Sequence, residues 1–141
     1  MDIKKYPPVV IVTMIVLSLT AFFGTMGATY QFGEWRAFVL APFPMWAVVR
    51  AVAYGLLPML AMIDIFHGKI SGRYLGSLSL MMTWGFMLRL LNPQMFMPRR
   101  SFIETTMVLP AFGIVITMAV LIVSFGFGKT SNRYFVQEEK D

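Results

Sequence analysis

The stretch PVVIVTMIVLSLTAFFGTMGA, residues 8–28, decides the fold class because it contains no charged side chain. An α-helix of this length is about 30 Å long, which equals the thickness of the hydrocarbon core of a membrane. Lys4 and Lys5 precede the stretch. It is longer than the apolar core of a secretory signal peptide, which has about 7 to 15 residues. We therefore expect residues 8–28 to form a transmembrane helix.

The composition of the whole chain agrees with a membrane protein. Of the 141 residues, 57% are hydrophobic and 13% are charged, whereas a soluble domain has about 25% charged residues. The net charge of +5 comes from cations that flank apolar runs and do not form one block, so we expect the lipid bilayer as a partner and no nucleic acid. The chain has no cysteine and one histidine, so we expect no metal site and no cofactor.

Residues 37–66 form a second apolar stretch that is too long for one straight span. At 1.5 Å per residue it would measure about 45 Å as a helix. Pro42 and Pro44 are expected to break it. We therefore expect residues 35–44 to lie along the membrane interface and residues 45–65 to cross it. Pro58, three residues after Gly55, is expected to kink this second span.

Two further apolar stretches complete the predicted architecture. Residues 74–91 and 107–128 are the third and fourth expected spans, and residues 129–141 form a polar tail. The predicted fold is an all-α integral membrane protein with a single domain, a small bundle of four transmembrane helices. An interfacial segment precedes the second span.

The distribution of cations predicts the orientation of this bundle. Four spans place both termini and the loop 66–73 on one side, and that side carries all five lysines. By the positive-inside rule both termini are cytoplasmic, and we expect a bacterial inner membrane.

The basic residues expected on the opposite side are all arginines. They are Arg36, Arg50, Arg89, Arg99 and Arg100, and two acids, Glu34 and Glu104, accompany them. The planar guanidinium group binds carboxylates and phosphates with two parallel hydrogen bonds. These arginines are therefore candidates for binding an anion or a lipid headgroup, and the two glutamates are candidates for ion pairs with them. Anchoring of the spans at the interface is the favoured alternative, because long basic side chains reach back to the headgroups.

Asp64 and His67 form the other polar pair of interest. Their spacing of three residues places them on one face of a helix, where a carboxylate can orient an imidazole for a proton relay. They also stand at the end of the second span, before Gly68 and Lys69. A helix end that meets water accounts for them without a catalytic role, and this interpretation is favoured.

Small residues recur at a spacing of four within the predicted spans, which is typical of helices that pack closely in membranes. They are Thr20, Gly24 and Ala28, then Gly72 and Gly76, then Ser79 and Thr83, and finally Gly113 and Thr117. Four such runs exceed the needs of one minimal bundle. We therefore expect some of them to face another protomer or another subunit.

These observations favour a small membrane protein that acts as an accessory, assembly or sensing subunit of a membrane complex or a homo-oligomer. An oligomeric ion channel or small-anion transporter, with arginines at its non-cytoplasmic mouth, is the first alternative. A small membrane enzyme that acts on a lipid is the second. The sequence contains no catalytic motif of a known enzyme class, so no catalytic residue is assigned and the enzyme is the less favoured class.

Overall fold

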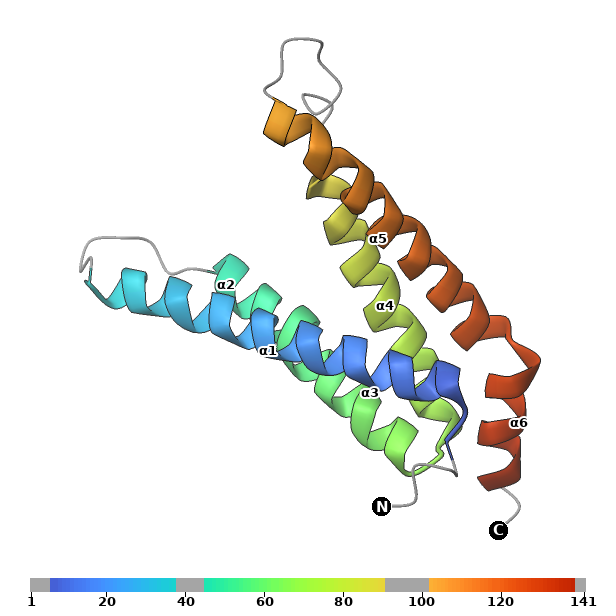
Figure 1. Cartoon of the computed structure of the whole chain (residues 1–141). Helices are drawn as coiled ribbons and strands as arrows, with labels where there is room; N and C mark the ends of the chain where they lie inside the picture. Colours follow the sequence, from blue (N-terminus) through green and yellow to red (C-terminus); the bar gives the residue numbers. More distant parts are fainter. Residues whose placement is uncertain (1–5, 38–44, 91–101, 139–141) are drawn as a thin grey trace.

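The structure is a computed structural model that describes residues 6–37, 45–90 and 102–138 (Figure 1). Every secondary-structure element within these ranges is a helix, as the sequence predicts. The elements are α1 (Pro8–Ala37), α2 (Met45–Arg50), the π-helix η2 (Ala51–Leu56), α3 (Leu57–Phe66), α4 (Ile70–Leu90), α5 (Phe102–Phe127) and α6 (Lys129–Glu138).

The helices form two antiparallel hairpins that diverge from one end of the molecule. One hairpin pairs α1 with the continuous run of α2, η2 and α3, and the other pairs α4 with α5 (Figure 1). They meet where α3 turns into α4, beside the start of α1, and α6 folds against the same place. We call this the closed end, and the opposite ends of the hairpins the open end. Among the described residues, α2 contacts α1 and η2 but neither α4 nor α5.

Three helical stretches are long and apolar enough to cross a membrane. They are Pro8–Gly33, Met45–Phe66 and Pro110–Phe127. The second agrees closely with the expected span 45–65. The helix that holds the first continues to Ala37, because polar residues after Ala28 end the apolar stretch without breaking the helix. Of the expected interfacial segment 35–44, residues 35–37 therefore belong to the last turn of α1, and residues 38–44 lie outside the described residues.

The expected third span coincides with α4, which is not one of these three apolar stretches. Its 21 residues give a length of about 32 Å, which is sufficient to cross the hydrocarbon core. Its side chains are more polar, because Arg73, Ser79 and Thr83 interrupt the apolar residues. Ser79 and Thr83 are buried against neighbouring helices. These two polar residues of α4 thus face protein.

The buried residues form a narrow stripe along each long helix. On α1 they include Val10, Leu17 and Ala21, and their spacing of seven and four residues keeps one face toward the partner helix. Leu80 of α4 and Phe125 of α5 belong to the same buried cluster. The seam resembles that of a coiled coil. Lipid chains are as apolar as leucine, so close contact is what holds such helices together in a membrane.

The helical stretch Met45–Phe66 widens into the π-helix η2 just before Pro58, near the place where the sequence predicts a kink. Proline has no N–H, and its ring collides with the carbonyl of the residue four positions earlier, here Tyr54. The N–H of Leu57 donates to the carbonyl of Val52, five residues back, so the chain gains one residue in this turn. The backbone of Tyr54 then lies directly against Gly24 of α1, where any side-chain carbon would overlap its carbonyl group.

Gly24→Ala is expected to destabilise the contact between α1 and η2. The added methyl group forces the two backbones apart, and overpacking of this kind costs about 1 to 3 kcal/mol. Gly27→Ala, one turn away on the same helix, meets open space and should be neutral or stabilising by up to about 1 kcal/mol. Unfolding of the purified variants in mixed detergent micelles, followed by circular dichroism, measures both effects. Equal stability of the two variants would contradict the close contact.

Candidate functional site at the closed end

The last turn of α3 ends in a glycine motif that satisfies its backbone carbonyls. Gly68 has a positive φ of 66°, which a residue without Cβ adopts at low cost. Its N–H donates to the carbonyl of Ile65 at 3.0 Å, and the N–H of Lys69 donates to the carbonyl of Asp64 at 2.9 Å. These two bonds define a Schellman motif, which ends a helix sharply. The chain can therefore turn into α4 at Ile70.

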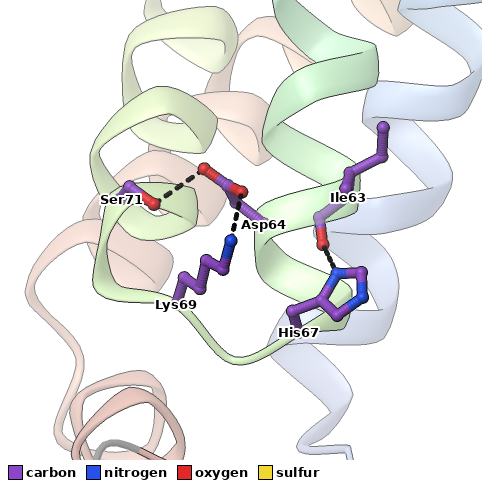
Figure 2. Close-up of polar contacts among 5 residues, drawn as sticks. All are labelled: Ile63, Asp64, His67, Lys69 and Ser71. Carbon is purple, nitrogen blue, oxygen red and sulfur yellow. Dashed lines mark hydrogen bonds and ion pairs between the residues drawn. The ribbon is translucent and has the colours of Figure 1, made fainter.

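The Asp64 carboxylate fastens this turn to the start of α4. The hydroxyl of Ser71 donates to Asp64 Oδ2 at 2.7 Å, and Lys69 Nζ lies 4.0 Å from Asp64 Oδ1 (Figure 2). Directly beside them, a Cβ on Gly72 would lie 2.5 Å from the backbone nitrogen of Ile65. Only glycine fits this approach of α4 to α3. The corner is thus fixed by one carboxylate and two glycines.

His67 lies at the end of α3 but binds a different partner from Asp64. Its Nδ1 is 2.7 Å from the carbonyl oxygen of Ile63 (Figure 2). A carbonyl only accepts hydrogen bonds, so Nδ1 carries the proton in this arrangement. His67 is the C-cap residue, with a ψ of 4° that departs from helical geometry. Asp64 contacts Ser71 and Lys69 instead, and a proton relay between Asp64 and His67 stays a prediction.

The helix α6 packs against the closed end of the molecule through two aromatic residues. The sequence predicts residues 129–141 to be a polar tail, but Tyr134 and Phe135 within it are buried. The hydroxyl of Tyr134 donates to the carbonyl of Ile65 at 2.8 Å, and the ring of Phe135 packs edge-to-face on Phe125 of α5. Sequence reasoning missed this contact. The spacing of Ser131, Tyr134 and Phe135, all buried, is the amphipathic signal that was available.

Arg73 joins α4 to the junction between α5 and α6. Its guanidinium donates to the side-chain oxygen of Asn132 at 2.7 Å and to the backbone carbonyl of Gly126. Gly126 lies in the last turn of α5, where carbonyls lack partners within the helix and a cation is favourable. Arg73 therefore acts as a side-chain cap for α5. Three other basic residues have exposed side chains: Lys69, just before α4, and Lys129 and Arg133 of α6.

Three of the five arginines predicted as an anion site lie in described helices. Arg36, in the last turn of α1, and Arg50, at the end of α2, have exposed side chains. Arg89 lies in the last turn of α4, on the hairpin that diverges from the first (Figure 1). Arg36 and Arg50 thus lie on one hairpin and Arg89 on the other, and an anion site formed by them stays a prediction. Arg99 and Arg100 lie outside the described residues.

The two predicted ion-pair partners also lie on different hairpins. Glu34 is in the last turn of α1 and Glu104 is in the first turn of α5. Their helices end far apart at the open end (Figure 1). The ion pairs themselves stay a prediction. Among the described residues, no three histidine, aspartate or glutamate side chains come together as a metal site would require.

Tyr134→Phe is expected to weaken the attachment of α6 while the rest of the fold persists. The substitution removes one buried hydrogen bond to a helix-end carbonyl, worth about 1 kcal/mol. Tyr74→Phe, at an exposed position on α4, is the control and should not change stability. Limited proteolysis of the C-terminal helix in detergent measures its release. Unchanged cleavage of the Tyr134 variant would show that the hydroxyl does not hold α6.

At the closed end, the capped ends of α3 and α5 lie beside exposed basic side chains. The capped helix ends give structural support, and the basic side chains can contact anions. The chain matches no protein-family model, no curated protein and no solved structure in the comparisons. Its function is to be inferred from its own residues and contacts.

Proposed function

We propose that this protein is a four-span membrane subunit that acts by packing its helices against other membrane helices, in a homo-oligomer or with another subunit. The observation that carries the proposal is that some glycines lie against a neighbouring helix of the chain and others do not. Gly24, Gly72 and Gly76 lie in close contacts within the chain, whereas Gly27, Gly85 and Gly113 face open space in the described structure.

Glycine in the interior of a helix costs about 1 kcal/mol relative to alanine, so each such glycine calls for a reason. In membranes that reason is usually the close approach of a second helix. The glycines of the first group have such a neighbour within the chain. Gly113 has none, although Thr117 one turn later presents a small side chain on the same face, with its hydroxyl bonded to the Gly113 carbonyl at 2.7 Å. This face of α5 fits a helix from another chain.

The membrane-spanning part of this proposal is supported by the large exposed surface of the apolar helices. Only 22% to 28% of the residues in each apolar stretch are buried within the chain. Trp46 and Phe66, both exposed, mark the two ends of the second span. They are 20 residues apart, or about 30 Å along a helix, and tryptophan collects at membrane interfaces because its ring is apolar and its N–H is polar. Lipid and neighbouring helices would cover the apolar surface between them.

The helix α4 is proposed as the remaining span because of its central position. It contacts α1, η2, α3 and α5 as well as α6, so its buried polar side chains are shielded from lipid. Polar residues in a span are tolerated where they face protein. The positive-inside rule then places the closed end, with both termini, in the cytoplasm of a bacterial cell.

Extraction in mild detergent followed by native mass spectrometry tests the subunit proposal. We expect a particle heavier than one chain of 16.0 kDa, with partner chains in fixed stoichiometry. Gly113→Leu should dissociate it, because the larger side chain blocks close approach at a position that makes no contact within the chain.

Ile116→Leu, on the same exposed part of α5, conserves volume and serves as the control that should leave the particle intact. Circular dichroism of the Gly113 variant should show an unchanged helix content. A lone monomer of the unaltered protein would contradict the proposal. If the assembly stays intact with Gly113→Leu, this face of α5 is not part of the interface.

A further inference from the structure

Four cations gather around one hydrogen bond at the closed end. The bond joins Arg73 of α4 to Asn132 of α6 at 2.7 Å. Lys69 lies four residues before Arg73, and Lys129 and Arg133 lie within three residues of Asn132. A spacing of four along a helix places Lys129 and Arg133 on the same face. We call these four residues the basic patch.

The basic patch has little compensating negative charge among the described side chains. Asp64 is 4.0 Å from Lys69 and is also bound to Ser71. The Lys69 side chain is still 65% exposed, so most of its surface meets the surroundings. Lys129 and Arg133 are exposed as well. The patch therefore presents several cations outward, on a helix that buried aromatic residues hold in place.

Helix dipoles account for only part of this arrangement. Arg73 lies at the C-terminal end of α5, where a cation is favourable. Lys129 is the first residue of α6, whose first turn has no acidic residue. A cation at the start of a helix is unfavourable, and an anion there is favourable. An external anion would offset this repulsion.

The position of the patch along the spans indicates where that anion comes from. Phe127 and Phe66 are exposed apolar residues at the ends of two spans, and Lys129 and Lys69 follow them by two and three residues. Exposed Tyr74 on α4 lies at the same end. Cations a few residues beyond the last apolar side chain stand at the depth of lipid headgroups.

We propose that the basic patch binds the phosphate headgroups of anionic phospholipids in the leaflet at the closed end. The proposal rests on the membrane-spanning part of the proposed function and not on its oligomeric part. Phosphate oxygens accept from the exposed ammonium of Lys129 and the guanidinium of Arg133. Arg73 is already bonded to Asn132 and Gly126, and it positions α6 for this contact.

The experiment compares the binding of an anionic and a zwitterionic phospholipid to the full chain. Protein purified in mild detergent is incubated with phosphatidylglycerol or with phosphatidylcholine of the same acyl chains, and bound lipid is counted by native mass spectrometry. A cation near an anionic surface raises affinity about fivefold. We therefore expect the unaltered protein to prefer phosphatidylglycerol, and the double variant Lys129→Gln with Arg133→Gln to lose about fivefold for each charge removed.

A matched control variant tests whether the lipid preference depends on the charge of this patch. Lys129→Arg with Arg133→Lys preserves both charges and should keep the preference. An excess of inorganic phosphate should fail to displace the lipid, because the acyl chains contribute to binding at this depth. Complete displacement by phosphate would overturn the proposal in favour of a free-anion site.

Equal binding of both lipids by the unaltered protein, or an undiminished preference in the variant Lys129→Gln with Arg133→Gln, overturns the proposal. If that variant loses helix content, Lys129→Gln alone is measured, and a loss of about fivefold is still expected. Resistance of the unaltered protein to extraction from membranes by alkaline carbonate tests membrane insertion separately. Failure there would overturn the spans themselves.

Discussion

The structure depends on the need to satisfy the backbone carbonyls that lack partners where helices end. At the closed end the last carbonyls of α3 receive the N–H groups of Gly68 and Lys69 and the hydroxyl of Tyr134. Those of α5 receive Arg73. The hydroxyl of Tyr134 and the guanidinium of Arg73 come from other helices, so these two caps also join the helices to one another. They contribute to the meeting of the two hairpins and to the docking of α6.

The sequence predicts what depends on uninterrupted apolar length, and less of what depends on contacts. Residues 8–28 and 45–65 are recognisable because charge is almost absent, and Pro58 indicates a local break because its ring excludes a regular turn. The docking of Tyr134 and Phe135 escapes such reasoning, since two apolar residues in a polar segment gain meaning only when Ile65 and Phe125 lie opposite. The divergence of the hairpins likewise depends on contacts that no periodicity contains.

At the candidate site, too, the sequence predicts the residues but not the contacts between them. Asp64 and His67 are found from the sequence, as is the alternative that they mark a helix end, and the structure adds that each binds a separate partner. The basic patch could have been anticipated only in part. Its four cations are visible in the sequence, but their proximity depends on the bond between Arg73 and Asn132, which are 59 residues apart. An anion site at the open end stays a prediction, because Arg36 and Arg50 lie on one hairpin, Arg89 lies on the other, and Arg99 and Arg100 lie outside the described residues.

The divergence of the hairpins also has a mechanical side. Both hairpins are joined at the closed end, and α1 extends over 30 residues, or about 45 Å. Over that length a rotation of about 5° about the closed end displaces the far tip by roughly 4 Å, which is most of one helical turn. The separation of the two hairpins at the open end is therefore sensitive to small differences in packing where they join.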